Sequence, residues 1–286
     1  MKNIKIFVDS ASDLPKDIAA KHDITVLPLY VTLGETTYLD DGQLTCGDLF
    51  DFVDKNDMLP KTAAVNMADF AKAFKPVLEA GDDALVFTIS SDLSSTPQNA
   101  FNAINELGAS DRIFLVDTRS LSSGIGLAAL KACDLRSQGL SAAEIKRKMD
   151  AEIVPNISAS FFVPLLDYLY KGGRCSRLSA YFGSKLKLSP QLVLIDGKIV
   201  PGEKFRGSWN KVCDDYLEVT LKDGSGIDKT RVFITHTAFD QAEKRAEIAK
   251  MLKEKFGFKQ VIDNFAGATI SSHCGPGTLG VLFIKE

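Results

Sequence analysis

Short apolar runs alternate with amphipathic segments along the first half of the chain, and this alternation limits the possible folds more than any other feature. Between the runs, apolar side chains recur every three or four residues, as they do on one face of a helix. The expected strands are Ile4–Val8, Ile24–Leu33, Ala84–Ile89 and Ile113–Val116. Strands that alternate with helices pair in parallel and are covered by those helices. We therefore predict a mainly parallel sheet flanked by helices.

Three helix start signals agree with this pattern. Thr45 with Asp48 and Ser141 with Glu144 have the spacing of a capping box, in which the hydroxyl and the acid each bond a backbone N–H of the other residue. Thr96-Pro97 offers an N-cap followed by a proline in the first turn. We expect helices to begin at these three places.

The regular pattern pauses at residues 153–156 and becomes less uniform afterwards. Asp196-Gly197 lies between two apolar runs, which is a strong signal for a hairpin. The later elements that we expect are a helix from about Phe239 to Phe256 and strands at Val232–Thr235, Val261–Phe265 and Val281–Ile284. The chain of 286 residues is long enough for two modest domains. We predict an α/β fold with two domains, 1–155 with the mainly parallel sheet and 156–286 with a mixed sheet.

The composition and the lengths of the apolar stretches exclude several classes of partner and indicate where the protein is located. The formal net charge is −3, from 34 Lys and Arg against 37 Asp and Glu, which argues against nucleic acid as a partner. The longest apolar stretches are shorter than the roughly 20 residues of a membrane span, and Asp9 comes too early for a signal peptide. We expect no membrane span and a cytoplasmic location. Five cysteines without short paired spacing and three histidines predict neither a disulfide framework nor a metal site.

Hydroxyl and acidic side chains follow three of the predicted strands, at residues 9–13, 90–96 and 117–120. Ligands of parallel sheets bind beyond such strand ends. The loop 90–96 is the most informative, because five of its seven residues carry hydroxyls and none is Lys or Arg. This composition suits one carboxylate better than a polyphosphate. The alternative is that these hydroxyls only cap the next helix and fill a turn.

A second unusual segment lies near the end of the chain. Residues 275–280 match G-x-G-x-x-G, but a strand and not a helix is expected to follow, so a dinucleotide site is excluded. A glycine-rich turn remains, with His273 at its edge. His236 ends the strand predicted at Val232–Thr235, and for both histidines a structural hydrogen bond is the commoner role. The absence of G-x-S-x-G and of a Walker loop argues against a serine hydrolase elbow and against autonomous use of ATP.

Four motifs, taken in order, resemble the DegV family over essentially the whole chain. They are Val8-Asp9-Ser10 with Asp13-Leu14-Pro15, Ser90-Ser91-x-Leu93-Ser94, Gly172-Gly173-Arg174 and His273-x-Gly275-Pro276-Gly277. The resemblance implies a two-domain α/β protein that holds a long-chain fatty acid at the domain interface. Some members serve as the lipid-binding subunit of a bacterial fatty acid kinase, in which a separate ATP-using subunit phosphorylates the acid. It therefore implies a binding protein without a cofactor, and not an enzyme.

The resemblance also implies roles for individual residues. The fatty acid carboxylate is expected near Thr62 and Ser94, and the other ligand-binding positions that match are Ser95, Thr96, His273, Gly275 and Gly277. Arg174 and Arg206 match basic positions expected to meet the kinase partner or the phosphorylated head group. The chain departs from the family pattern at residues 63–66, where it reads Ala-Ala-Val-Asn in place of Ser-Gln-Pro-Ser, and at Ser95 and Pro97.

Two other functions stay open at this point. Ser94 and His273, with Asp9, can converge in space to form a serine-type hydrolase or an acyl-transferring enzyme. Alternatively, the Gly172-Gly173-Arg174 turn is an interaction surface of a protein that holds no lipid.

Overall fold

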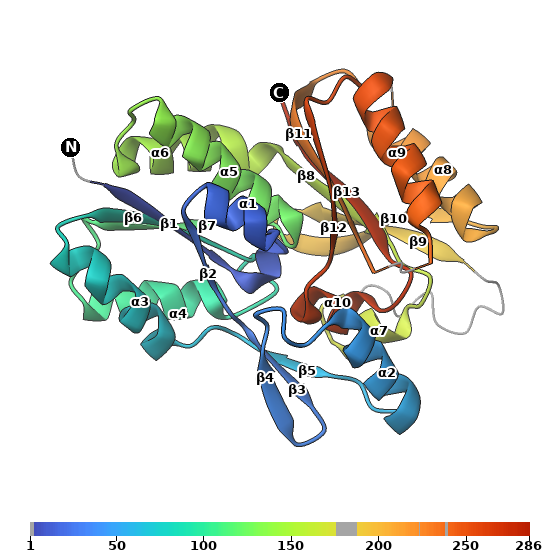
Figure 1. Ribbon diagram of the computed structural model, residues 1–286, viewed down its shortest axis with the longest axis horizontal. Helices are drawn as coiled ribbons and strands as arrows, with labels where there is room; N and C mark the ends of the chain where they lie inside the picture. The colour runs from blue at the N-terminus through green and yellow to red at the C-terminus, as the bar shows by residue number, and fades with distance from the viewer. Residues whose placement is uncertain (1–2, 176–187, 223, 238–239) are drawn as a thin grey trace.

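The computed structural model describes residues 3–175, 188–222, 224–237 and 240–286. Within these residues two large sheets lie side by side, sheet A from the first half of the chain and sheet C from the second, with a small sheet B below them in Figure 1. None of the helices in these ranges combines the length and apolar character that crossing a bilayer requires.

Sheet A is parallel throughout and has the strand order β2-β1-β6-β7. Its strands are β1 (Ile4–Asp9), β2 (Ile24–Leu27), β6 (Asp83–Thr88) and β7 (Ile113–Asp117). Helices α3 (Met67–Glu79) and α4 (Thr96–Glu106) cover one face, and α5 (Ser123–Ser137) and α6 (Ala142–Lys148) cover the other (Figure 1). The parallel sheet flanked by helices is therefore confirmed.

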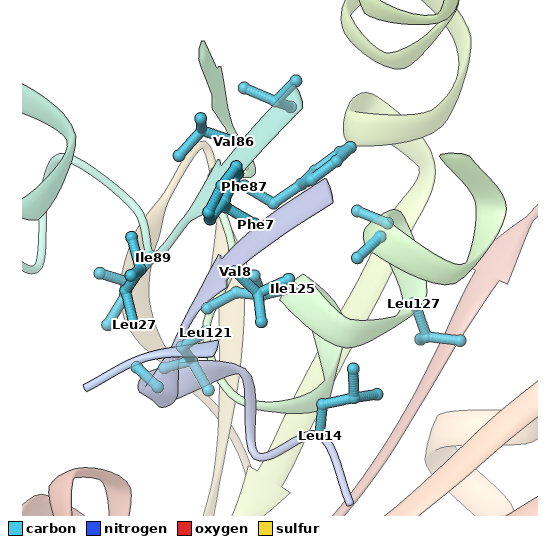
Figure 2. Close-up of a cluster of buried hydrophobic side chains, with 14 of the residues drawn as sticks. Phe7, Val8, Leu14, Leu27, Val86, Phe87, Ile89, Leu121, Ile125 and Leu127 are labelled. Carbon is cyan, nitrogen blue, oxygen red and sulfur yellow. The ribbon is translucent and has the colours of Figure 1, made fainter. Parts of the chain in front are cut away.

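Both faces of sheet A are buried, because parallel strands sandwiched between helices leave no face for solvent. Figure 2 shows this core, in which Val8 of β1 lies near Ile125 of α5. Phe7 packs edge-on against Phe74 of α3, at 5.6 Å between ring centroids. Successive residues of β1 thus face opposite helical layers.

Sheet C is mixed and has the order β10-β9-β8-β13-β11-β12, as predicted for the second half of the chain. Its strands are β8 (Ile157–Phe162), β9 (Ser189–Ile195), β10 (Lys198–Phe205), β11 (Ile227–His236), β12 (Gln260–Phe265) and β13 (Leu279–Lys285). Among the described strands of sheet C, only β11 and β12 pair in parallel. Helices α8 (Trp209–Leu221) and α9 (Ala242–Glu254) pack on this sheet. Helix α5 contacts strands of both large sheets, and this explains why it is buried nearly all round.

Sheet B has the order β4-β3-β5 and lies beside three short helices. Its strands are β3 (Tyr30–Leu33), β4 (Thr36–Leu39) and β5 (Lys61–Ala63), and the helices are α2 (Cys46–Asn56), α7 (Asp167–Lys171) and α10 (Ala268–Cys274). Helix α1 (Lys16–Lys21) packs against β2. The prediction of one strand over Ile24–Leu33 is wrong. Pro28 lacks the N–H that continued pairing requires, so the chain leaves sheet A after Leu27 and enters sheet B at Tyr30.

The two predicted capping boxes and the predicted hairpin turn are confirmed, whereas the predicted N-cap at Thr96 is wrong by one residue. Both capping boxes are present, and Asp196 and Gly197 have φ of +49° and +79°, as a tight hairpin turn between β9 and β10 requires. The N-cap before Pro97 is Ser95 and not Thr96, because the Ser95 carbonyl already accepts the first helical hydrogen bond, from the N–H of Asn99 at 3.0 Å. The predicted helix start at Phe239 lies outside the described residues. Residues 153–156 form helical turns and not a pause.

Candidate functional site

Helix α10 is held at its start by two buried aspartate side chains from the first half of the chain. Asp13 accepts the N–H of Gly267 at 2.7 Å, and Asp40 accepts those of Ala268 and Thr269 at 3.0 and 3.2 Å. The first turn of a helix has N–H groups without partners inside the helix, so these acids complete it. Their positions fix where the side chains of α10 lie relative to sheets A and B.

Asp13 is costly to ionise because it is removed from water. Burial raises the pKa of Asp13 to about 8, although the Ser122 hydroxyl and the Gly267 N–H stabilise its charged form. Burial likewise raises the pKa of Asp9 to about 7, against the bond that it accepts from the Ile89 N–H. The Asp9 side chain therefore links the end of β1 to Ile89, the residue that follows β6. It does not cap the short helical turn that begins after it.

A cavity of about 260 Å³ lies against α10 and is called the α10 cavity below. Its polar lining is Thr62, Ser94, Ser95, Arg174, Thr269 and His273. Its remaining lining is Leu29, Ala63, Ala64, Ile89, Leu93, Leu121, Leu169, Ile199, Ile270 and Cys274. Residues from both halves of the chain thus enclose a mainly apolar space with a few polar groups, which is the usual make-up of a small-molecule site.

Thr62 and His273 meet in this cavity although 211 positions separate them, with 2.8 Å between Thr62 Oγ1 and His273 Nε2. Burial, together with the charge of Arg174, lowers the pKa of His273 to about 4. The imidazole is therefore neutral near pH 7. The ring packs close to Gly172, where an added Cβ would lie 2.6 Å from His273 Nδ1.

The hydroxyl-rich loop after β6 contributes Ser94 and Ser95 to the cavity. Ser94 Oγ accepts the N–H of Thr96 at 3.2 Å and lies 2.9 Å from Thr96 Oγ1. Thr96 itself is fully buried and does not line the cavity. When Thr96 donates its hydroxyl hydrogen to Ser94, the Ser94 hydroxyl is left to donate its own hydrogen into the cavity.

The arrangement does not favour a serine nucleophile. A serine and its base need a hydrogen bond, at about 2.6–3.2 Å in a working dyad, and none joins Ser94 to His273 among the described residues. His273 instead bonds Thr62, and its low pKa makes it a weak base. Asp9 bonds the Ile89 N–H and does not orient the imidazole.

Arg174 lies at the boundary between the α10 cavity and a more polar neighbouring cavity of about 350 Å³. Lys198 and Asp92 line that second cavity, which also shares Leu93 and Ile199 with the first. Arg206 is exposed after the end of β10 and lines neither cavity, so its expected docking role stays a prediction.

Gly275 and Gly277 form the turn between α10 and β13 and line neither of these two cavities. Their φ values of +73° and +76° explain why glycine occupies both positions. Gly275 lies against the ring of Tyr168, and the Gly277 carbonyl accepts the Trp209 indole N–H at 2.7 Å. Their expected contact with a ligand stays a prediction.

Sequence reasoning missed several residues of the site. Thr269 and Ile270 line the cavity, but α10 has no capping signal in the sequence because its start is completed by Asp13 and Asp40 from far away. A larger cavity of about 610 Å³ also lies beside the start of α10. We take the smaller cavity as the candidate site, because it collects Thr62, Ser94 and His273. Among the described residues, no three His, Cys, Asp or Glu side chains gather as a metal site requires.

A family model, described as "Uncharacterised protein, DegV family", matches residues 3–286. The chain belongs to the DegV family. This assignment confirms the resemblance inferred from the four motifs and the α/β fold that it implied.

Members of the DegV family with similar sequences or structures cover nearly the full chain. A DegV domain-containing protein of Deinococcus radiodurans is 33% identical over 98% of this chain and 97% of its own. A Thermotoga maritima protein named "Fatty acid-binding protein" is 30% identical over 97% of this chain and 96% of its own. The structure "Fatty Acid Binding of a DegV family Protein from Thermus thermophilus" matches with a TM-score of 0.90 at 29% identity, over 99% of this chain and 100% of that one.

Proposed function

We propose that this protein binds a long-chain fatty acid in the α10 cavity and presents the carboxyl group to a separate, ATP-dependent fatty acid kinase subunit. The observation that carries the proposal is the meeting of Thr62, Ser94 and His273 in an otherwise mainly apolar cavity. Relatives named for fatty acid binding support the same ligand class. Because the proposed partner uses ATP, the proposal includes a cytoplasmic location.

The carboxylate is expected to accept hydrogen bonds from the hydroxyls of Ser94 and Thr62. Either Thr62 Oγ1 or His273 Nε2 can be the donor in their hydrogen bond. When Nε2 carries the hydrogen and donates it to Thr62 Oγ1, the Thr62 hydroxyl hydrogen is left to donate to the ligand. Hydrogen bonds to a charged group are worth more than neutral ones, at about 1.5–3 kcal/mol each. The hydroxyls and the histidine therefore orient the head group.

The apolar walls are expected to supply most of the affinity. Each buried methylene contributes about 0.8 kcal/mol, so a tail of about fifteen carbons supplies on the order of 12 kcal/mol before the costs of binding. Leu121, Ile270 and Cys274 also line a narrow inner cavity, which adjoins the α10 cavity and is lined further by Phe161 and Leu282. The lining comes from residues 29–121 and 169–274, which supports a site between the proposed domains 1–155 and 156–286.

The direct test is to purify the protein from a bacterial host, denature it, extract it with organic solvent and identify the extract by mass spectrometry. We expect a stoichiometric long-chain fatty acid. A protein that comes without fatty acid and also fails to take up added fatty acids would remove the proposal.

Ser94→Ala is expected to weaken fatty acid binding about tenfold, because one hydrogen bond to the carboxylate is lost while the apolar walls are unchanged. Titration of the delipidated protein with a fluorescent fatty acid measures this. Ser91→Ala, in the same loop but outside the cavity lining, is the matched control and should bind as the wild type does. Unchanged affinity in Ser94→Ala would remove Ser94 from the head-group site.

Arg174→Ala is expected to keep the fatty acid but to reduce its phosphorylation by the kinase subunit. Arg174 is an exposed part of the cavity lining, and its guanidinium donates a hydrogen bond to the nearby Gly172 carbonyl at 2.7 Å, so its loss leaves the apolar lining in place. Fatty acid content and acyl phosphate formation are measured on the same preparation, with Lys171→Ala as a control. Full phosphorylation of the acid held by Arg174→Ala would contradict the docking role.

A further inference from the structure

His236, at the end of β11, is a buried polar residue that the proposed head-group site does not use. Its side chain is 1% exposed. Its Nε2 lies 3.1 Å from Asp263 Oδ1, and its ring packs against Phe265 at 4.3 Å between centroids. These contacts fix the ring and leave the Nδ1 edge facing away from Asp263.

Nδ1 of His236 is buried and has no hydrogen-bond partner among the described residues. The residue lines a small inner cavity of about 20 Å³. The other polar side chains that line this cavity already have hydrogen-bond partners: Ser122 bonds Asp13, Thr235 bonds Asn264, Thr237 bonds the Gly275 carbonyl and Thr278 bonds the Cys274 carbonyl. The imidazole edge is therefore the unsatisfied polar group of the cavity.

The inner cavity adjoins the α10 cavity. The two share Leu121, Ile270 and Cys274, and the inner one adds Phe161 and Leu282. A tail whose carboxylate lies at Ser94 and Thr62 meets this space when it passes between Leu121 and Ile270. His236 thus lies beside the apolar part of the site, away from the head group.

A hydrocarbon tail cannot satisfy that nitrogen. A bare Nδ1 needs a hydrogen-bond donor, and a protonated one needs an acceptor. A hydroxyl group can serve as either, and a space of about 20 Å³ accommodates a group of the size of one water molecule.

We infer that His236 forms a polar subsite inside the acyl cavity, which binds a hydroxyl group carried on the chain of the fatty acid. The inference rests on the proposed function, since it assigns a substrate class to the same site. This polar subsite makes the protein selective for hydroxylated over unsubstituted long-chain fatty acids. A single buried water on Nδ1 is the competing occupant.

The test is competition against a fluorescent fatty acid, using acids of one chain length that differ only in the presence and position of one hydroxyl group. We expect one positional isomer to bind about fivefold more tightly than the unsubstituted acid, as one net hydrogen bond provides. A hydroxyl placed in a wholly apolar channel weakens binding instead. Weaker binding of every isomer would therefore overturn the inference in favour of the water.

Two variants separate recognition from folding. His236→Phe keeps a planar ring, removes Nδ1 and leaves Asp263 beside Arg245 at 3.3 Å. It should bind the unsubstituted acid and lose the preference for the hydroxylated one. Asp263→Asn is the control, because its amide oxygen still accepts from Nε2 and leaves Nδ1 unchanged, so the preference should persist. A preference that survives in His236→Phe would overturn the inference.

If His236→Phe fails to fold, an NMR measurement on the wild-type protein still tests the inference. The ¹⁵N resonance of His236 Nδ1 should shift when the preferred hydroxylated acid binds and should shift less with the unsubstituted acid. Equal shifts with both acids would overturn the inference. Binding of the unsubstituted acid without any hydroxyl preference rejects only the inference, whereas failure of every acid to bind rejects the proposed function as well.

Discussion

Gly172→Ala is expected to weaken fatty acid binding by about tenfold to a hundredfold, the loss of one or two charge-assisted hydrogen bonds. An added Cβ would lie 2.6 Å from His273 Nδ1 and 2.8 Å from the Tyr168 carbonyl oxygen. Both separations are shorter than real Cβ contacts, and the carbonyl belongs to the backbone of α7. The imidazole must therefore move, and its 2.8 Å bond to Thr62 is lost.

The matched control for this substitution is Gly173→Asn. Gly173 has nothing within 4 Å of an added Cβ, and its φ of +71° is one that asparagine adopts more readily than other residues. We expect the control to bind nearly as the wild type does, with both variants titrated by a fluorescent fatty acid after a thermal unfolding check. Wild-type affinity in Gly172→Ala would show that His273 is not needed for head-group binding.

The protein is expected to be less stable at about pH 8.5 than at about pH 6.5. Burial raises the pKa of Asp13 to about 8 and that of Asp9 to about 7. The folded state therefore binds more protons than the unfolded state above pH 4, and stability falls as the pH rises toward 8. His273 acts in the opposite sense only below about pH 6.5, because its pKa is lowered. The window between pH 6.5 and 8.5 thus lies above the titration of His273.

Asp13→Asn should flatten this pH dependence and raise the stability at about pH 8.5 by up to a few kcal/mol. The amide oxygen can accept the Gly267 N–H, and the amide N–H₂ can donate to the Ser122 hydroxyl in place of the protonated acid. Urea unfolding at both pH values measures the effect. Asp17→Asn, on exposed α1, is the control for removal of one negative charge. A wild-type slope retained in Asp13→Asn would show that Asp13 is ionised throughout the window.

The sequence alone determined the elements whose signals are local. Apolar periodicity placed β1, β6 and β7 of sheet A, and the two capping boxes and the Asp196-Gly197 turn were correct, because each depends on residues within a few positions of one another. The motif order identified the family, and the hydroxyl-rich loop predicted that Ser94 lines a ligand site. The strands, the capping boxes and the hairpin turn follow from backbone geometry that a short segment sets by itself.

The tertiary structure decided what depends on distant contacts. Pro28 ended a strand that apolarity alone would have continued, and α10 formed where no local cap exists because Asp13 reaches a residue 254 positions away. The same packing placed His273 on Thr62, whereas Thr96 and the turn glycines stayed outside the α10 cavity although their neighbours line it. Which side chains share a buried space depends on how sheets A and C pack around α5 and α10, and no short-range pattern encodes that packing.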